Sequence, residues 1–268
     1  MFKERLTSGI VLVLILTAVL YLGGTPTFLM TAVVSLIGYY ELLRVFQAEK
    51  TAIGVIGYTV SIFYYALLMV EMDELILPLS LVLLIALLAV YVLTFPKYHF
   101  HQVEAGFFGF FYVTILLSYV YRIRMMDSGG VYVVLLFLGS WGNDTLAYCA
   151  GRLFGKHKMS PVLSPKKTIE GAVGGVLGAG LLGFLYSLIA KQFVLSDKNL
   201  GLIFVGVCMV GALLSIIGDL AASAIKRNFE IKDYGTLIPG HGGILDRFDS
   251  VIFIAPIIYY YLKYTIGA

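Results

Sequence analysis

The sequence predicts an all-α, polytopic integral membrane protein with about nine transmembrane helices and a cytoplasmic N-terminus. Composition is the first reason, because 60% of the 268 residues are hydrophobic, 13% are charged and the mean hydropathy is +0.93. A soluble domain carries about 25% charged and about 45–50% apolar residues. Length is the second reason, because apolar stretches of the ~20 residues that a membrane helix needs recur along the whole chain.

Nine apolar stretches are long enough to be membrane-spanning helices. They cover approximately residues 6–23, 27–46, 52–71, 75–96, 103–122, 130–150, 169–190, 200–225 and 244–264. The first follows a charged N-terminus as a signal peptide would, but no convincing cleavage site comes after it, so we expect a retained helix. The connections are short except for residues 151–168 and 226–243, and no internal repeat is visible.

Basic residues set the expected orientation, because Lys and Arg are enriched in cytoplasmic loops. With the N-terminus inside, thirteen of the 19 Lys and Arg residues lie on the cytoplasmic side and five lie outside, while Arg247 lies just within the last span. The acidic turn at residues 71–74 then falls outside. Both long loops, 151–168 and 226–243, face the cytosol.

Two classes of site find no support in the composition. A net charge of +3 gives no basis for nucleic-acid binding. Cys149 and Cys208 both lie in apolar stretches, which predicts thiols that pack as small hydrophobic groups rather than a disulfide framework or a zinc site.

Four carboxylates are predicted at a similar depth below the cytoplasmic loops, namely Asp144, Asp219, Asp246 and Asp249. At 1.5 Å per residue, Asp144 precedes Arg152 by about 12 Å and Asp219 precedes Lys226 by about 10 Å. Asp246 and Asp249 share a helix face by their i, i+3 spacing. Unpaired carboxylates would repel one another and be costly to bury, so a divalent cation such as Mg²⁺ is expected. The alternative is a structural network in which each Asp pairs with a nearby Lys or Arg.

The polar segment 223–249 lies between two long apolar stretches. Its basic side chains beside paired carboxylates suit a phosphate-rich substrate escorted by a divalent cation. Within it, I-P-G-H-G-G at residues 238–243 runs directly into the last helix. Glycine lets backbone N–H groups approach a ligand, and a helix N-terminus favours anions, so Gly242 and Gly243 are expected to cradle phosphate. His241 is expected to contact phosphate or nucleotide, with metal ligation and loop capping as alternatives.

A second polar cluster, residues 159–171, opens the seventh span. Thr168 is expected to cap the helix, with Glu170 in its first turn. Lys166 and Lys167 then stand beside the positive end of the helix, which strengthens the attraction for phosphate. The plainer interpretation is an ordinary basic loop on the cytoplasmic side.

Two shorter patterns concern packing. Small-xxx-small spacings at Gly171–Gly175 and Gly174–Gly178 predict close approach of another helix, from this chain or from a second subunit. Glu41 and Arg44 lie at i, i+3 on the second span, and we expect a structural ion pair near the cytoplasmic face.

The segment 223–249 resembles the C-terminal motif of the phosphatidate cytidylyltransferases, also called CDP-diacylglycerol synthases. The matching positions are Ser223, Lys226, Arg227, Lys232, Asp233, Gly235, Pro239, His241, Gly242, Gly243, Asp246, Arg247 and Asp249. The string S-P-K-K-T-x-E-G, residues 164–171, is similar to a second stretch of the same family. The resemblance is specific over residues 139–250, whereas the first five predicted helices carry no motif of their own.

The resemblance implies a nucleotidyltransferase of phospholipid biosynthesis that condenses CTP with phosphatidic acid to give CDP-diacylglycerol and pyrophosphate. It implies Mg²⁺ as cofactor, with a second cation left open, and metal ligation by Asp219 and Asp246 first, then by Asp249 and Asp144. Catalysis is expected from Asp219, Asp246, Lys226, Arg227 and Lys167. Substrate binding is expected from Ser223, Lys166, Lys232, His241, Gly242, Gly243 and Arg247.

Residues 1–125 are then expected to form about five structural helices, and residues 126–268 a catalytic region with the loops 151–168 and 226–243. The expected location is the cell (inner) membrane, with the active site facing the cytoplasm. Expected partners are CTP, phosphatidic acid and membrane lipids, with a homodimer left open and no nucleic acid. The alternative function is a polytopic cation transporter or channel, because Asp residues within the membrane also mark ion paths. A CDP-alcohol phosphotransferase is disfavoured, because this chain lacks the D-G-x-x-A-R string of that family.

Overall fold

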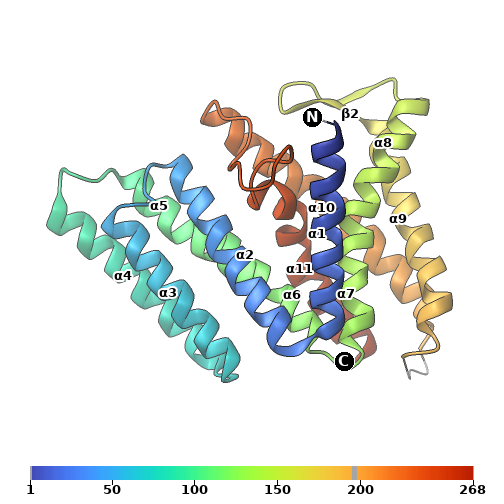
Figure 1. Cartoon of the computed structure of the whole chain (residues 1–268), viewed down its shortest axis with the longest axis horizontal. Coiled ribbons are helices and arrows are strands. Elements are labelled where there is room, and N and C mark those ends of the chain that lie inside the picture. Colours follow the sequence, from blue (N-terminus) through green and yellow to red (C-terminus); the bar gives the residue numbers. More distant parts are fainter. Residues whose placement is uncertain (1, 195–197, 268) are drawn as a thin grey trace. The chain divides into compact units, whose positions relative to one another are not determined.

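The computed structural model describes residues 2–194 and 198–267, which form helices joined by short connections and one hairpin (Figure 1). The α-helices are α1 (Phe2–Leu22), α2 (Gly24–Val45), α3 (Ala52–Met69), α4 (Ile76–Thr94), α5 (Phe100–Gly109), α6 (Leu116–Arg124), α7 (Gly129–Phe137), α8 (Asn143–Phe154), α9 (Ile169–Ala190), α10 (Leu200–Asn228) and α11 (Leu245–Ile266). A 3₁₀ turn, η1 (Asp73–Leu75), precedes α4, and two π-helical turns, η2 (Phe110–Ile115) and η3 (Leu138–Gly142), join α5 to α6 and α7 to α8.

The chain divides into two compact units. Unit 1 comprises Met1–Ile10, Phe28–Ser118 and Asp233–Arg247, and unit 2 comprises Val11–Thr27, Tyr119–Lys232 and Phe248–Ala268. Helices α1, α2, α6 and α11 each contribute residues to both units. The predicted division into structural helices, residues 1–125, and a catalytic region, residues 126–268, was based on function and not on packing. It stays a prediction.

In unit 1, polar side chains tie the helices together inside an apolar core. The Tyr39 hydroxyl donates to the Gly106 carbonyl oxygen at 2.6 Å, and Tyr64 and Ser118 share a hydrogen bond of the same length. Such buried pairs satisfy groups that would otherwise be costly in an apolar environment. The first bond ties α2 to α5, two residues before Glu41, and the second ties α3 to α6.

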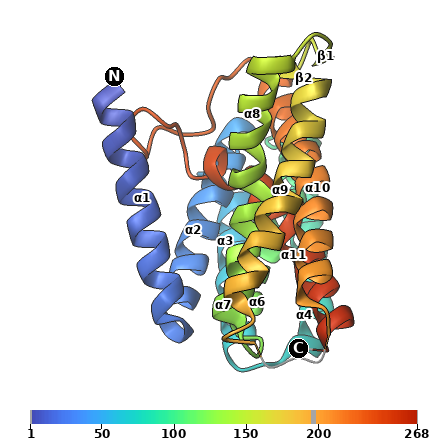
Figure 2. The same cartoon turned by 90° about the vertical axis from the view of Figure 1, so that its right-hand side faces the viewer.

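In unit 2, α9 packs between α8 and α10 (Figure 2). Its glycines allow both approaches. A Cβ atom at Gly175 would lie 2.5 Å from Asn143 Oδ1 and 2.8 Å from Ala147 Cβ on α8, while one at Gly183 would lie 2.5 Å from the Phe204 carbonyl oxygen on α10. The close packing predicted from the small-xxx-small spacings is confirmed, and its partner is a helix of the same chain.

Six helical stretches among the described residues are long and apolar enough to cross a membrane, by length and composition. They are Gly24–Val45, Ala52–Met69, Asp73–Thr94, Phe100–Arg124, Ile169–Ala190 and Leu200–Asn228. The first predicted span matches only a shorter apolar helix, Leu6–Leu22. Residues 130–150 are divided among α7, η3 and α8, and α11 carries Asp246, Arg247 and Asp249 in its first two turns. The all-α membrane architecture is thus confirmed, and the count of nine spans stays a prediction.

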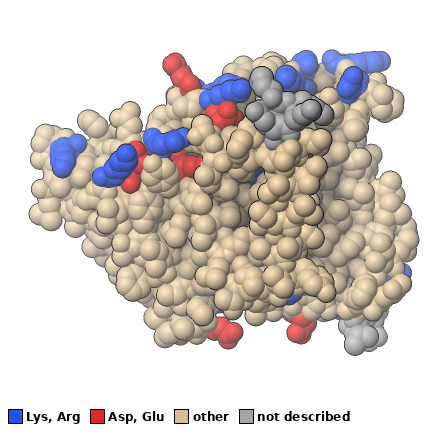
Figure 3. Space-filling view, viewed as in Figure 1, with Lys and Arg blue, Asp and Glu red and all other residues tan. Residues whose placement is uncertain are grey.

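The surface is that of a protein that meets lipid. On α4, large apolar side chains at intervals of about one helical turn are exposed, among them Leu77, Leu81, Ile85 and Val92. Figure 3 shows that Lys, Arg, Asp and Glu cover little of the face it displays. An exposed apolar helix face of this length is unfavourable in water and is matched by hydrocarbon chains.

Candidate functional site

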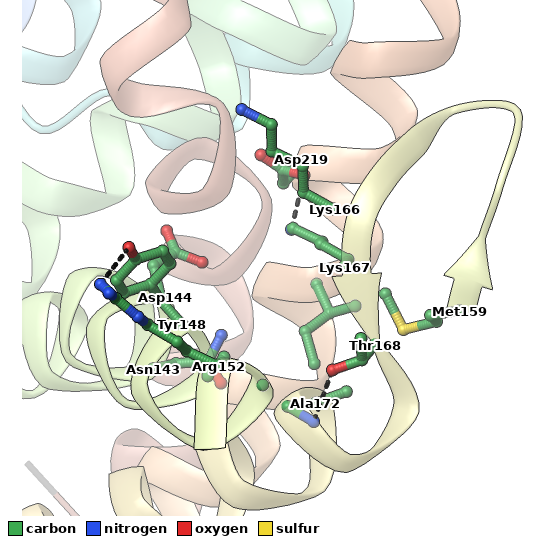
Figure 4. Close-up of a pocket in the computed structure, with 14 residues that line it drawn as sticks. Asn143, Asp144, Tyr148, Arg152, Met159, Lys166, Lys167, Thr168, Ala172 and Asp219 are labelled. Atoms are coloured by element: carbon green, nitrogen blue, oxygen red, sulfur yellow. Dashed lines mark hydrogen bonds and ion pairs between the residues drawn. The ribbon is translucent and has the colours of Figure 1, made fainter. Parts of the chain in front are cut away.

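Unit 2 contains a cavity of about 320 Å³ lined by α8, the hairpin strands β1 (Lys158–Ser160) and β2 (Ser164–Thr168), the start of α9, and α10 (Figure 4). Its volume falls in the range of about 300–1,000 Å³ that small-molecule sites occupy. Five charged residues border it, namely Asp144, Arg152, Lys166, Lys167 and Asp219. Four of these five are residues that the sequence placed in the site, and Arg152 is an addition.

One face of α8 supplies almost half of the lining. Asn143, Ala147 and Gly151 follow one another at i, i+4 and i+8, with Asp144 and Tyr148 beside them. Residues four apart on a helix share a face. The π-helical turn η3 comes directly before Asn143 and adds a residue to that turn of helix, so it changes which side chains of α8 point into the cavity.

The hairpin delivers the two lysines. Strands β1 and β2 pair antiparallel, with Lys158 opposite Thr168, so the predicted loop 151–168 is partly a small sheet. Thr168 then caps α9, because its Oγ1 accepts the Gly171 N–H at 3.1 Å, as the sequence predicts. Glu170 accepts the backbone N–H groups of Lys156 and His157 and pairs with His157 Nδ1 at 2.6 Å, which ties the hairpin to the helix.

The shortest polar contact on the border of the cavity is an ion pair between two of the elements that line it. Lys167 Nζ lies 2.6 Å from Asp219 Oδ2, linking β2 to α10, and both side chains are partly exposed, at 29% and 28%. Figure 4 shows these groups pointing toward one another. The pair gives local support to the alternative of a structural network, in which Asp pairs with Lys. The same geometry also suits a ligand site, because a metal cation could take the place of the ammonium at Asp219, and a phosphate could take the place of the carboxylate at Lys167.

Arg152 and Tyr148 lie on the α8 side of the cavity, where the Arg152 Nη1 donates to the Tyr148 hydroxyl at 3.4 Å. Both side chains are exposed, and Asp144 beside them is half-buried. Neither Arg152 nor Tyr148 was among the residues that the sequence placed in the site. The recurrence of Asp144, Tyr148 and Arg152 every four residues was a signal that could have found them.

Asn143 is a residue of the cavity that sequence reasoning missed. Its side chain is fully buried, and neither Oδ1 nor Nδ2 has a hydrogen-bond partner among the described residues. A buried amide without partners costs about 1–3 kcal/mol for each unsatisfied group. The cavity that Asn143 borders offers a place for the missing partner.

In unit 1, Asp246 organises the segment 233–247. Its Oδ2 accepts the Tyr234 N–H at 2.7 Å and the Gly243 N–H at 3.0 Å, and the side chain is buried. Gly242 has φ of +89°, a conformation that favours glycine, and its carbonyl oxygen accepts the Ile238 N–H. Asp246 therefore shapes the loop, and its predicted role as a metal ligand stays a prediction.

The anion that meets the N-terminus of α11 is a protein carboxylate. Glu41 Oε1 accepts the Ile244 N–H at 3.0 Å, and Oε2 accepts the Leu245 N–H at 2.8 Å. Arg44 Nη2 donates instead to the Tyr234 carbonyl oxygen at 2.6 Å. The ion pair predicted between Glu41 and Arg44 stays a prediction: the Arg44 charge acts favourably on the Glu41 carboxylate, while the hydrogen bonds of both side chains described above go to backbone groups of this segment.

His241 contacts the N-terminal helix. Its Nδ1 shares a hydrogen bond of 2.9 Å with the Ser8 hydroxyl, which lies at the same distance from the Pro239 carbonyl oxygen. This contact agrees with a capping role for His241, the third of the alternatives that the sequence left open. The phosphate-binding roles of His241, Gly242 and Gly243 stay predictions.

The remaining candidates lie on α10, on the segment after it and on α11. Ser223 and Lys226 are half-buried near the end of α10, whereas Arg227 and Lys232 are exposed. Arg247 is half-buried and Asp249 is buried in the first turns of α11. Helix α11 passes α10 closely, because a Cβ atom at Gly218 would lie 3.2 Å from the Asp249 carbonyl oxygen. Asp249 therefore lies beside the residue that precedes Asp219.

The donor set fits Mg²⁺ in a limited way. Over residues 2–194 and 198–267, no group of three or more His, Cys, Asp or Glu side chains is arranged to hold a metal ion. Mg²⁺ is commonly bound by one or two carboxylates, with waters and substrate phosphates completing the coordination. Asp144 and Asp219, which border one cavity, meet that smaller requirement.

Comparisons with known proteins agree over nearly the whole chain. The model of the Cytidylyltransferase family matches residues 3–265. The phosphatidate cytidylyltransferase of Staphylococcus epidermidis is 36% identical over 262 residues, which cover 96% of this chain and 97% of the relative. That of Staphylococcus haemolyticus is 34% identical over 260 residues, with the same coverage. That of Bacillus subtilis is 30% identical over 271 residues, covering 97% of each.

Proposed function

This chain belongs to the Cytidylyltransferase family, and we propose that it condenses CTP with phosphatidic acid to give CDP-diacylglycerol and pyrophosphate. The relatives named phosphatidate cytidylyltransferase support the choice of substrates. The observation that carries the proposal is the cavity of unit 2, where Arg152, Lys166 and Lys167 border the same space as Asp144 and Asp219. Cations and carboxylates that share one small cavity suit a polyphosphate and its counter-ion.

The reaction is nucleotidyl transfer. An oxygen of the lipid phosphate attacks the α-phosphorus of CTP, the bond between the α-phosphorus and its bridging oxygen to the β-phosphate breaks, and pyrophosphate leaves. The second pKa of a phosphate monoester is about 6, so the attacking group is already largely dianionic near neutral pH. A strong general base is therefore not required. The main barrier is the repulsion between two anions, which fixed positive charges reduce.

Each cation of the cavity has a task in this scheme. Lys167 comes from β2 and faces α10, so its ammonium would leave Asp219 for a phosphate oxygen as substrate enters. Arg152 and Lys166 are exposed and would capture the triphosphate from solution. The Asn143 side-chain amide would donate a hydrogen bond to a substrate oxygen, which would supply the acceptor that the amide lacks among the described residues. Asp144 and Asp219 would hold Mg²⁺, which supplies charge neutralisation between the two anionic substrates.

The finer features of the architecture belong to the same proposal. We place nine spans in the cell membrane, with the N-terminus and both loops, 151–168 and 226–243, on the cytoplasmic side. Six spans found by length and composition support the membrane location, and the distribution of Lys and Arg supports the orientation. The cytoplasm is also where CTP is available. A homodimer remains part of the proposal.

The experiment is a direct assay of the purified protein. With cytidine-labelled CTP and phosphatidic acid, the label is expected in a lipid-soluble product, and pyrophosphate is expected in equal amount. Excess EDTA is expected to abolish turnover and Mg²⁺ to restore it. Label that stays water-soluble in the presence of Mg²⁺ would contradict the function, whereas full activity in EDTA would contradict only the metal site.

The cation transporter is the weaker explanation. It accounts for carboxylates within helices, but it gives no role to Arg152, Lys166 and Lys167, which would repel a transported cation from the same cavity.

A further inference from the structure

Segment 233–247 carries five of the residues that the sequence placed in the site, and its shape depends on a side chain that lies almost 200 residues earlier. Glu41 belongs to α2 and is 4% exposed. Its two carboxylate oxygens accept the N–H groups of Ile244 and Leu245, at 3.0 and 2.8 Å. These N–H groups lie at the N-terminus of α11, where a helix lacks internal acceptors and carries partial positive charge.

Two glycines make room for this carboxylate. A Cβ atom at Gly235 would overlap Glu41 Oε1, and a Cβ atom at Gly243 would overlap both oxygens. Neither glycine has a positive φ, so neither is required by backbone conformation. The two positions therefore have a steric reason to be glycine, and the reason is Glu41.

The contacts form a closed circuit within unit 1. Arg44, one turn after Glu41, donates to the Tyr234 carbonyl oxygen at 2.6 Å. The Tyr234 N–H donates to Asp246 at 2.7 Å, and Asp246 also accepts from Gly243 at 3.0 Å. Gly243 in turn packs against Glu41. Each member of the circuit fixes the next, which leaves the first turn of α11 little freedom.

We propose that Glu41 is a positioning residue, which holds Asp246 and Arg247 in the arrangement that turnover requires. The inference rests on the proposed function, because it treats segment 233–247 as part of the enzyme's working machinery. Glu41 itself need not touch substrate. Its loss displaces the first turn of α11, and a displacement of about 1 Å at a reacting group can lower a rate about 100-fold.

The test compares three variants of the full-length protein in detergent or nanodiscs. Glu41→Ala removes both acceptors, Glu41→Gln keeps one acceptor oxygen, and Gly235→Ala displaces the carboxylate without changing it. Glu104→Gln is the matched control, because Glu104 is an exposed glutamate on α5 of the same unit. The expected kcat of the folded fraction falls about 10–100-fold for Glu41→Ala and Gly235→Ala, less for Glu41→Gln, and stays unchanged for the control.

Hydrogen–deuterium exchange supplies a readout that does not depend on activity. Amides of residues 233–247 are expected to exchange faster in Glu41→Ala and Gly235→Ala, while those of α4 keep the wild-type rate. An unchanged exchange rate in segment 233–247 would overturn the inference. So would faster exchange accompanied by wild-type kcat in the folded fraction, because Glu41 would then serve stability alone.

Failure of the proposed function is a separate result. If the wild-type protein forms no lipid product from CTP and phosphatidic acid, the function is wrong, and the exchange experiment still decides whether Glu41 holds the segment. If the wild-type protein is active and Glu41→Ala is equally active, the function stands and the positioning role is wrong.

Discussion

Asp219 and Lys167 form an ion pair on the border of the cavity of unit 2. They come from α10 and β2, are 52 residues apart in sequence, and are joined at 2.6 Å on the border of a cavity. Both are only partly buried, so their ion pair adds little to the free energy of unfolding. Breaking an ion pair that stabilises the fold so little costs little free energy, so both side chains could turn to bind ligands instead. This suits groups that act on substrate.

The first prediction concerns the carboxylate. Asp219→Asn keeps the shape of the side chain and removes its charge, so turnover of CTP should fall by at least about 100-fold while the protein remains folded. The measurement is product formation per folded molecule, with folding followed by size-exclusion chromatography. Asp127→Asn is the control, because Asp127 is exposed in the same unit and lies outside the cavity. Activity within a few fold of wild type in Asp219→Asn would remove this residue from the site.

The second prediction concerns the ammonium. Lys167 precedes α9 and Lys191 follows it, so 22 helical residues, or about 33 Å, separate the two positions. Lys167→Ala should raise the apparent KM for CTP, whereas Lys191→Ala, an exposed lysine at the other end of the helix, should leave it unchanged. Because capture by exposed cations weakens with salt, the difference between the two variants should shrink as ionic strength rises. Equal KM values for both variants would contradict the assignment.

At the scale of elements, α9 shows how glycine brings two neighbours close. Gly175 faces α8 and Gly183 faces α10, each with less room than a methyl group needs. Small residues at such positions are the usual means of close helix approach in membranes. The approach also fixes the geometry of the cavity, since α8 and α9 both line it.

The third prediction uses two glycines with opposite surroundings. Gly175→Ala should lower the melting temperature, because overpacking a tight contact costs about 1–3 kcal/mol. Gly130→Ala should leave it equal or higher, since Gly130 is an exposed residue of α7 with no atom closer than 3.7 Å to a new Cβ, and alanine favours helix by about 1 kcal/mol. Thermal unfolding of both variants in the same detergent gives the comparison. Destabilisation of equal size would show that packing against α8 is not the cause.

Some elements were predictable and others were not, for physical reasons. The cap by Thr168 and the packing of α9 follow from local rules, a hydroxyl before a helix and small residues four apart. The hairpin β1–β2 was missed, because its residues lack the alternation of apolar and polar side chains that marks a strand. The π-helical turn η3 has no sequence pattern of its own. Asn143 was missed because no spacing in the sequence marks a buried amide without hydrogen-bond partners. The contacts of Glu41 with Ile244 and Leu245 were missed because these residues lie about 200 positions later in the chain.

For the whole molecule, composition predicted the membrane class correctly, whereas six of the nine predicted spans meet the criteria of length and hydropathy among the described residues. Hydropathy counts an apolar stretch, whereas the helices at α7–α8 and α11 mix apolar residues with polar and charged ones, such as Asn143, Asp144, Asp246 and Asp249. Polar residues that a site needs lower the hydropathy of the helix that carries them. Helices that carry several polar residues are therefore the hardest to identify as spans from hydropathy.

The fourth prediction tests the orientation. In a background with Cys149 and Cys208 replaced, Val162→Cys and Thr236→Cys should react with an impermeant thiol reagent only from the cytoplasmic side, because both positions are exposed in the long loops. Glu74→Cys, at the acidic turn that precedes α4, should react only from the opposite side. Labelling of inverted and right-side-out vesicles distinguishes the two. The reverse pattern would place both loops away from the cytosolic CTP pool.

In the Lys167–Asp219 ion pair, each side chain also competes with any ligand that binds the other side chain. A cation that binds Asp219 has to displace an ammonium held 2.6 Å away, and an anion that binds Lys167 has to displace a carboxylate. Lys167→Met should therefore change two affinities in opposite directions, with tighter binding of a divalent cation and weaker binding of an anionic phosphate. Calorimetric titrations with Mn²⁺ and, separately, with pyrophosphate measure the two constants. A parallel loss of both affinities would show that the pair does not compete with either ligand.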